Sequence, residues 1–332
     1  MRVIVVTNVY PSPESPASGA FVAAQVRGLE AAGVDVRLVQ VARRERGAGV
    51  YARLRGVIAG EVAAWRPDLV HVRYGGVMAA VVTRSTSDVP VLVTFCGTDL
   101  LGSPAEPLPR RMTIAVGVRA SRQAARRSSG IVIVSENLRA ALPSDVDPDR
   151  VWLLPDPVDL AVFQPRDRGD CRAQLGWDPD RHHILFPSSP ARAEKRFSLA
   201  ADAVALLARD GIPIELHALE GVPHDEVPVW LNASDAVVLT STHEGSPNAV
   251  KEALACDVPV VSVDVGDVGS LLRGIDGCYL AAVDPFDLAD NLRRVVEGGG
   301  RIAGRARASG LSVERNAAQL VEIYETLVGR SG

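Results

Sequence analysis

The sequence has 332 residues, of which 47% are hydrophobic and 23% are charged. This composition predicts a folded protein of two domains and excludes an intrinsically disordered chain, because disordered segments contain too few apolar residues to form a core. The formal net charge of −4 is divided unevenly: residues 1–155 carry 19 Arg against 13 Asp and Glu (+6), and the remainder carries 17 basic against 27 acidic residues (−10). The basic first half could meet an anionic membrane surface or an anionic acceptor, although solvated helix faces would give the same composition.

The cysteines and the apolar runs indicate the compartment. The four cysteines are far apart and form no Cys-x-x-Cys pair, which is typical of reduced thiols and not of a disulfide framework or a zinc site. No apolar run approaches the roughly 18 residues required to span a bilayer, and the N-terminus lacks a signal-peptide pattern. We therefore expect a cytoplasmic protein, and the basic first half permits peripheral contact with the inner face of the membrane.

Short β-branched runs alternate with helical periodicity along the first half of the chain. A helical pattern runs from Phe21 to Leu29, between the first two apolar runs. Nearly continuous apolar strands separated by helices predict a parallel sheet covered on both faces. The predicted strands are Val3–Thr7, Val36–Val41, Leu69–Val72, Val91–Phe95, Ile131–Val134 and Val151–Leu154.

The second half repeats this alternation after a proline-rich linker at residues 155–165. We expect domains at residues 1–155 and 156–310, and a C-terminal helix within 311–332 that packs back toward the first domain. Two doubly wound domains that face each other would leave a ligand cleft at the carboxyl ends of their strands. The predicted strands of this half are Ile184–Pro187, Ile214–Leu219, Ala236–Leu239, Val258–Val263 and Cys278–Leu280.

Two common nucleotide-binding motifs are absent from the sequence. The first strand runs into Asn8-Val9-Tyr10-Pro11 without the Gly-x-Gly-x-x-Gly fingerprint, which argues against a nicotinamide dehydrogenase. Neither lysine follows a glycine, so a phosphate-binding loop of the Walker type is excluded. Gly19 precedes the first helix and could admit a phosphate or sugar to backbone amides, or serve only as a turn residue.

The chain contains only two lysines, Lys195 and Lys251, and both lie near predicted strand-to-helix junctions, which suggests two parts of one site. The loop before Lys195 also carries Arg192, and Lys195 opens the predicted helix that follows. A point charge, a two-pronged donor and a helix amino end together suit a diphosphate. Alternatively, this is a surface loop in which Glu194 neutralises one of the cations.

A second segment has two glutamates with seven residues between them, Glu244 and Glu252. A helix starting near Pro247 would place Asn248 and Glu252 one turn apart on one face, with Ala249 and Ala253 forming a smooth second face. The two carboxylates could accept hydrogen bonds from the hydroxyl groups of a sugar and a ribose. A single acid stabilising the helix dipole would explain Glu244 but not the pair.

We read no metal site from the six histidines, which offer no ligand spacing, or from the Asp-x-Asp pairs, which fall in proline-containing loops.

These residues resemble the retaining glycosyltransferases of family 4, which have the GT-B fold of two facing Rossmann-like domains. The resemblance covers nearly the whole chain. Its most specific part is the glutamate-seven-glutamate motif of Glu244 and Glu252, and Arg66-Pro67-Asp68, the segment 94–99 and the hinge at 155–159 also match.

The resemblance implies a role for each candidate residue. Arg192 and Lys195 would hold the donor diphosphate, Glu244 would contact the sugar, and Glu252 would bind the ribose. Gly19 would lie near the diphosphate. The sugar pocket would be lined by Gly245, Ser246, Pro247, Asn248 and Ala249, and the candidates for the sugar or acceptor side are Cys96, Gly97 and Asp99.

The implied reaction uses a nucleotide-diphosphate sugar of UDP or GDP type, with no metal and no cofactor, and a polysaccharide, lipid-linked or natural-product acceptor. The sequence departs from the family pattern at Cys96, where a histidine is usual, at Asp156 in the hinge, and at Arg196, where a glycine usually follows the lysine. Two alternatives remain: a non-catalytic sugar- or nucleotide-binding subunit of a glycan biosynthetic complex, which the Cys96 departure fits, and a UDP-sugar epimerase. No nucleic-acid partner is expected.

Overall fold

The structure is a computed structural model, and it describes the chain except for residues 13–17, 42–46, 48, 87, 103–107 and 331–332. The chain forms two compact units. The first comprises Met1–Pro157 with Val313–Gly332, and the second comprises Val158–Ser312. Among the helices of the described residues, none is both long enough and apolar enough to cross a bilayer.

The first unit is built on a parallel sheet of six strands in the order β2-β1-β3-β4-β5-β6. Every residue of the central strands β3 and β4 is buried, and most are apolar, as the sequence predicts for a parallel sheet covered on both faces. The strands are β1 (Arg2–Thr7), β2 (Asp35–Gln40), β3 (Leu69–Arg73), β4 (Val91–Phe95), β5 (Gly130–Ile133) and β6 (Val151–Leu153).

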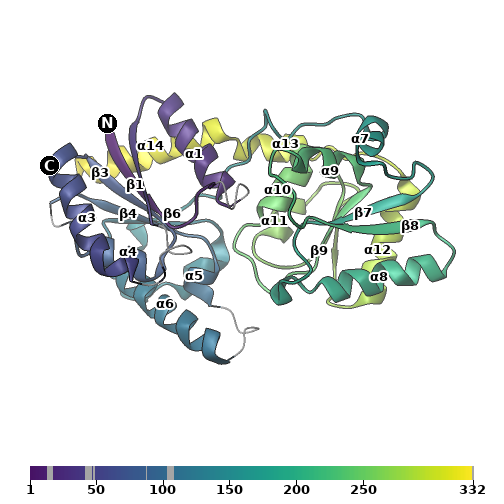
Figure 1. Ribbon diagram of the computed structural model, residues 1–332, viewed down its shortest axis with the longest axis horizontal. Helices are drawn as coiled ribbons and strands as arrows, with labels where there is room; N and C mark the ends of the chain where they lie inside the picture. Colours follow the sequence, from purple (N-terminus) through teal and green to yellow (C-terminus); the bar gives the residue numbers. More distant parts are fainter. Residues whose placement is uncertain (13–17, 42–46, 48, 87, 103–107, 331–332) are drawn as a thin grey trace. The chain divides into compact units, whose positions relative to one another are not determined.

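Helices cover both faces of this sheet (Figure 1). The residues of α3, α4 and α6 pack against Ile4 and Val72 on one face, and those of α1 and α14 pack against Val5 and Leu92 on the other. The helices are α1 (Ala20–Ala31), α3 (Val50–Trp65), α4 (Gly76–Val82), α5 (Thr98–Leu101), α6 (Leu108–Arg127) and α14 (Val313–Gly329), with 3-10 turns η1 (Glu136–Ala141) and η2 (Pro148–Arg150).

The second unit has a five-stranded parallel sheet in the order β11-β10-β9-β7-β8. Strand β10 begins at Val260, two residues later than the sequence suggested, because Pro259 has no amide hydrogen to contribute to the ladder. The strands are β7 (His182–Phe186), β8 (Ile214–Ala218), β9 (Ala236–Leu239), β10 (Val260–Val263) and β11 (Tyr279–Ala281).

Alternate side chains of β7 divide the core of the second unit. Ile184 and Phe186 pack with α8 and α12, whereas Leu185 packs with α9 and α10 on the opposite face. The helices are α7 (Arg168–Leu175), α8 (Phe197–Arg209), α9 (Val227–Ala233), α10 (Asn248–Ala255), α11 (Val268–Leu272), α12 (Pro285–Gly298) and α13 (Arg305–Ala308), with 3-10 turns η3 (Ala193–Lys195) and η4 (Ser309–Leu311). The α/β class with two parallel sheets is therefore confirmed.

The polar interior of the first unit contains a buried ion pair between Arg73, the last residue of β3, and Asp156, in the segment after β6. The Arg73 Nη2 to Asp156 Oδ1 distance is 2.5 Å, and the two side chains are 1% and 6% exposed. The ring of Phe21 lies 5.7 Å from the Arg73 guanidinium carbon. Burial opposes the charge of Arg73, but the neighbouring Asp156 outweighs burial and raises the pKa of the guanidinium. This pair fixes the segment leading out of the first unit to the central sheet.

Candidate active site

The loop after β7 carries the two cations predicted to bind a diphosphate. Helix α8 begins only at Phe197, so Lys195 ends the 3-10 turn η3 and does not open the helix as predicted. The cause is Arg196, whose left-handed backbone (φ 51°) interrupts the helical path. Lys195 forms an ion pair with Glu244, and each side chain is 15% exposed. The fold thus brings Lys195 together with Glu244, the carboxylate of the second predicted segment.

Arg196 fastens this turn to the loop after β9. Its Nε and Nη2 donate to the carbonyl oxygens of Thr240 (2.6 Å) and Ser241 (2.9 Å). Thr240 Oγ1 donates in return to the carbonyl oxygen of Lys195 (2.7 Å). A side chain in the left-handed region costs about 1–2 kcal/mol, and the two charge-assisted hydrogen bonds offset that cost. Sequence reasoning missed this role of Arg196, and the available signal was an arginine where the family usually has glycine.

Glu244 lies in the loop between β9 and α10, as predicted. Its Oε1 accepts hydrogen bonds from Lys195 Nζ and from Ser241 Oγ, the latter at 2.7 Å. The neighbouring Gly245 carbonyl is approached closely by Gly266, which has φ 62°. A Cβ at position 266 would clash with that carbonyl oxygen and would lie 3.2 Å from Glu244 Cβ. Gly266, also missed from the sequence, therefore permits the close packing that shapes the Glu244 loop.

The amino end of α10 presents polar atoms without partners. The helix begins at Asn248, one residue later than predicted, and Pro247 is its N-cap residue and not its first helical residue. Ser246 Oγ and Asn248 Oδ1 are buried and have no hydrogen-bond partner within the described residues. Because buried polar groups are normally paired, a polar ligand group at this end of α10 would complete their hydrogen bonding.

Glu252 lies one turn after Asn248 on α10 and is partly buried. Burial raises the pKa of its carboxyl to about 7, and the charge of Lys251 acts in the opposite direction. Lys251 is itself fully buried, so of the two lysines only Lys195 has exposed atoms. Ala249 is partly exposed, whereas Ala253 belongs to the core and does not extend the predicted second face.

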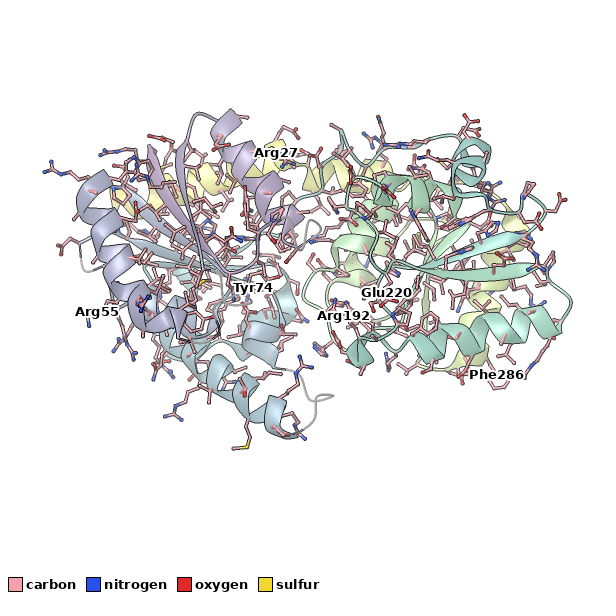
Figure 2. All side chains as sticks on the ribbon, in the orientation of Figure 1. Arg27, Arg55, Tyr74, Arg192, Glu220 and Phe286 are labelled. Carbon is pink, nitrogen blue, oxygen red and sulfur yellow. The ribbon has the colours of Figure 1, made fainter. Side chains whose placement is uncertain are left out.

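Arg192 has a different setting from Lys195. Its side chain is 56% exposed, and its Nε donates to Glu194 Oε1 at 2.8 Å. Ser189, in the same loop, donates to Glu220 (2.5 Å), and Figure 2 labels Arg192 and Glu220 in this region. Arg192 thus has the neutralised surface position that the sequence left as an alternative, whereas Lys195 pairs with Glu244.

The remaining predicted residues belong to the first unit. Gly19 precedes α1 with φ 73°, and a Cβ there would lie 2.5 Å from the carbonyl oxygen of Val9, so the backbone itself requires glycine. Asp99 is occupied by structural contacts, since its carboxylate accepts hydrogen bonds from the amides of Gly75 (2.8 Å), Cys96 (3.1 Å) and Gly97 (2.8 Å). Burial raises the pKa of Asp99, and these amides act against the rise. Asp99 thus shapes the loop whose partly buried Cys96 stays a candidate for the sugar or acceptor side.

Comparison with known proteins agrees with this architecture. A family described as "Glycosyl transferase 4-like domain" matches residues 1–157, and "Glycosyl transferases group 1" matches residues 201–298, together more than three quarters of the chain. The chain is 27% identical to TuaC of Bacillus subtilis, whose name assigns it to teichuronic acid biosynthesis, over 82% of this chain and 83% of TuaC. It is 30% identical to a D-inositol 3-phosphate glycosyltransferase of Pseudarthrobacter chlorophenolicus over 70% of this chain, a match that spans 62% of that relative's length.

Solved structures show the same fold. Sucrose-phosphate synthase from Thermosynechococcus elongatus superposes with a TM-score of 0.78 at 17% identity, covering 99% of this chain and 100% of that one. HepE of Anabaena, solved with UDP, superposes with a TM-score of 0.70 at 17% identity, covering 98% and 100%. A UDP-GlcNAc 2-epimerase from Methanocaldococcus jannaschii follows at 0.63 and 11% identity, covering 97% and 99%. The two family matches, on two parallel-sheet units, show that the chain belongs to the group 1 (family 4) glycosyltransferases of the GT-B fold.

Proposed function

We propose that the protein is a retaining, metal-independent glycosyltransferase that moves a sugar from a nucleotide-diphosphate sugar to a polysaccharide, lipid-linked or natural-product acceptor. The observation that carries the proposal is the pairing of Lys195 with Glu244. The unpaired polar atoms of Ser246 and Asn248, in the segment that follows Glu244, support it. A cation, a carboxylate and open hydrogen-bonding atoms are the groups that a diphosphate and a sugar require.

In this proposal the diphosphate leaving group is stabilised by fixed charge. Lys195 supplies an ammonium held in place by the turn that Arg196 fastens, and the amino end of α10 supplies partial positive charge. Arg192 is the second cation, and it would have to leave Glu194 to reach the diphosphate. The reaction needs no cofactor. When the bond between the sugar and the diphosphate breaks, its electron pair stays on the phosphate oxygen, and these cations stabilise the resulting charge.

Glu244 and Glu252 would bind the sugar and the ribose by accepting hydrogen bonds from hydroxyl groups. Retention of the anomeric configuration follows if the acceptor oxygen attacks from the face on which the diphosphate departs. The departing phosphate then takes the acceptor's proton, so no protein base is required. The hydrogen bonds that Lys195 and Ser241 donate to Glu244 Oε1 fix its carboxylate, as suits a group that orients the sugar.

UDP is the first donor nucleotide to test, with GDP as the second. HepE was solved with UDP, with UDP and glucose, and with UDP-glucose. The likeness to HepE is one of fold, so the base is a proposal for this chain.

The acceptor is proposed to be anionic or to lie at an anionic membrane surface. Helix α6 contains six arginines and no acidic residue. A groove of about 1040 Å³ along it is lined by Arg111, Arg119 and Arg122, and by Met112 and Val116, which are 67% and 62% exposed. Cations interleaved with exposed apolar side chains are typical of membrane-surface helices. The sequence of the first unit has a second group of arginines, at positions 43, 44, 46, 53 and 55. The first three lie outside the described residues, and Arg55 projects from α3 (Figure 2).

Vesicle co-sedimentation tests this surface. The protein should sediment with phosphatidylglycerol vesicles and not with phosphatidylcholine vesicles, and sedimentation should decline as salt is raised. Replacing Arg119 and Arg122 with Glu should abolish binding, while Arg209→Glu, an exposed arginine of the second unit, should not. Equal binding to both vesicle types would contradict the membrane part of the proposal and leave the donor site unaffected.

The donor site is tested by thermal stabilisation with UDP, GDP, dTDP, ADP and CMP, each with and without magnesium. A ligand at about 100 times its dissociation constant adds roughly 2.7 kcal/mol of stability. We expect one nucleoside diphosphate to stabilise the protein equally with magnesium and with a chelator. Stabilisation by none of them would refute the nucleotide-sugar proposal and favour the non-catalytic subunit. Dependence on magnesium would refute the metal-independent mechanism.

Two variants that break the same ion pair distinguish an electrostatic role of Lys195 in the reaction from a purely structural role of the pair. Lys195→Met should lower turnover by about 10²–10³-fold, as expected for loss of a group that stabilises developing charge, and should weaken nucleotide binding. Glu244→Gln leaves the ammonium in place and removes a neighbouring negative charge. It should preserve or strengthen nucleotide binding while lowering sugar transfer. Equal loss of nucleotide affinity in both variants would indicate that the pair has only a structural role.

A further inference from the structure

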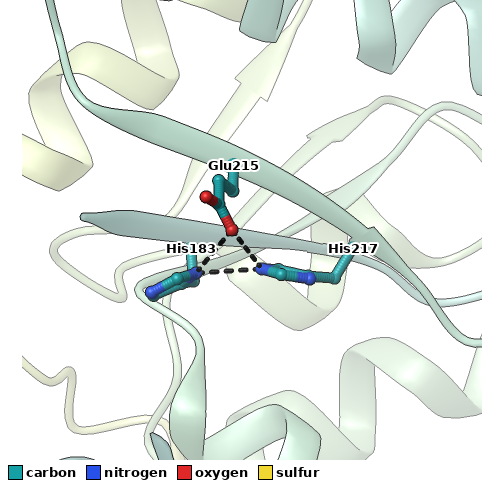
Figure 3. A group of neighbouring side chains, drawn as sticks. All are labelled: His183, Glu215 and His217. Atoms are coloured by element: carbon teal, nitrogen blue, oxygen red, sulfur yellow. Dashed lines mark hydrogen bonds and ion pairs between the residues drawn. The ribbon is translucent and has the colours of Figure 1, made fainter. Parts of the chain in front are cut away.

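Three potential metal-ligating side chains meet on one face of the second sheet. Strands β7 and β8 are paired in a register that sets His183 opposite Glu215, and His217 follows two residues later on the same face. One ligand atom from each residue lies within 4.8 Å of the other two (Figure 3). The sequence reading found no metal-ligand spacing, because these residues become neighbours only through the strand register.

The hydrogen bonding of His183 determines where its lone pair points. Its Nε2 lies 2.7 Å from the carbonyl oxygen of Asp178, and a carbonyl oxygen only accepts, so Nε2 carries the hydrogen. Nδ1 therefore carries the lone pair, and it lies 2.9 Å from Nε2 of His217. This is the arrangement of a metal-bound histidine, whose second ring nitrogen donates to a backbone carbonyl or a carboxylate.

Glu215 supplies a negative charge beside the two imidazoles. Its Oε2 lies 3.9 Å from His183 Nδ1 and 3.7 Å from His217 Nε2, beyond hydrogen-bond distance of either nitrogen. Its Oε1 accepts from Arg181 at 2.8 Å, which orients the carboxylate. A proton shared by the two histidines would satisfy those rings and leave Oε2 outside the interaction. A divalent cation would use all three atoms.

We propose that His183, Glu215 and His217 form a binding site for a divalent transition metal of the Zn²⁺ type, with the fourth position open to water. Two imidazoles and one carboxylate are a ligand set that Zn²⁺ accepts in tetrahedral geometry. Zn–N bonds of about 2.0–2.1 Å place two ligand nitrogens about 3.3 Å apart, so the two rings need to separate by a few tenths of an ångström. Glu215 needs to approach by a similar amount.

The surroundings are suited to holding these ligands in place. Trp177 stacks on His217 with ring centroids 3.7 Å apart and an interplanar angle of 9°, and Trp230 packs edge-on against Trp177. His183 is fully buried. Because β8 is the edge strand of the sheet, a metal at this position ties the edge to its neighbour β7. The site therefore stabilises the second unit, and it is independent of the sugar-transfer proposal, since its ligands include none of the donor-site residues.

Metal titration of the full chain, purified without a histidine tag and treated with a chelator, tests the proposal. Calorimetry with Zn²⁺ should show one equivalent bound, and Co²⁺ should give the intense visible absorption of tetrahedral coordination. His217→Gln and Glu215→Gln should each weaken Zn²⁺ binding by more than the 10–100-fold that is typical of losing an outer-shell partner. His182→Gln removes a histidine adjacent in sequence that is outside the cluster, and it should bind as the unchanged protein does.

The partly exposed Glu215 provides the variant that is least expected to disturb folding, since its side chain is 38% exposed and Gln has the same shape. Absence of Zn²⁺ binding to the unchanged protein, or unchanged affinity in His217→Gln and Glu215→Gln, would overturn the proposal. Loss of the metal in His182→Gln would also overturn it, because binding would then involve residues other than these three.

Discussion

The buried pair between Arg73 and Asp156 gives a quantitative prediction about the segment leading out of the first unit. Asp156→Asn keeps the shape of the side chain and leaves the guanidinium, 1% exposed, without a compensating charge. Removing one partner of a buried pair typically costs about 3–5 kcal/mol. For a folding unit of about 150–250 residues, each kcal/mol lowers Tm by roughly 2–4 °C, so we expect Tm of the first unit to fall by about 6–20 °C.

The assay must distinguish the two units, because proteins with more than one compact unit depart from two-state unfolding. Scanning calorimetry gives Tm, and hydrogen exchange of peptides from β3 and β6 assigns the shifted transition to the first unit. The matched control is Glu61→Gln, which breaks the exposed pair with Arg37 (42% and 35% exposed, 3.0 Å) in the same unit. That control should cost less than about 1 kcal/mol.

A double-mutant cycle tests the reasoning further. Arg73→Met alone leaves a buried carboxylate, whereas Arg73→Met combined with Asp156→Asn removes both charges. Since neither charge is then left unpaired, the double variant should be more stable than the sum of the single changes predicts, with a coupling of about 0.5–3 kcal/mol. Simple additivity, or a cost below about 1 kcal/mol for Asp156→Asn, would refute the view that this pair is an interdependent buried unit.

Three further predictions concern the second unit. Arg196→Gly should destabilise the turn by about 1–2 kcal/mol and weaken nucleotide binding, because two charge-assisted hydrogen bonds are worth more than the backbone strain relieved. The control is Arg66→Gly, at an exposed position with φ 50°, which should be neutral or stabilising in thermal unfolding. If Arg196→Gly also stabilised the protein, the hydrogen bonds of Arg196 would not outweigh its backbone strain. Gly266→Ala should reduce stability and nucleotide affinity by displacing the Gly245 carbonyl, whereas Gly274→Ala, with φ 73° and open space, should incur only the backbone cost. Burial raises the pKa of Glu252 to about 7. Between about pH 4.5 and 7 the unfolded chain therefore binds fewer protons than the folded one, and stability falls as pH rises. Glu252→Gln should remove this slope of stability against pH, and an unchanged slope would contradict the raised pKa.

The sequence was sufficient for the strands because their signal is local. Runs such as Val91–Phe95 are apolar on both faces, and that pattern occurs where helices cover a parallel sheet on both sides. The ends of strands depend on hydrogen bonding between strands, which the local sequence does not show. Val258, for example, was predicted to begin a strand that starts at Val260, after Pro259. The same locality explains why Lys195 and Glu244 could be located in the loops that follow two strands: chain order alone gives that position.

The sequence did not reveal which cation would meet which carboxylate. Arg192 is two residues from Glu194 and pairs with it, whereas Lys195 reaches Glu244 across 49 positions of sequence. Arg196, which follows Lys195 with a left-handed backbone, binds the carbonyl groups of Thr240 and Ser241 in the loop that carries Glu244. Composition and periodicity do not indicate that backbone state. The His183 cluster was missed for a related reason, since strand register and not spacing brings it together.

Two departures from the family pattern have structural compensation within the same chain, and this bears on how such departures should be interpreted. Arg196 replaces the usual glycine at a position with φ 51°, and it makes hydrogen bonds to two carbonyl groups that glycine could not reach. Asp156 replaces the usual hinge residue and is the buried partner of Arg73. A departure that resulted from loss of function would have no reason to gain a matched partner elsewhere. Restoring the family residue at either position alone should therefore lower stability. At position 196 the carbonyl groups of Thr240 and Ser241 would lose their donor, and at position 156 Arg73 would lose its counter-charge.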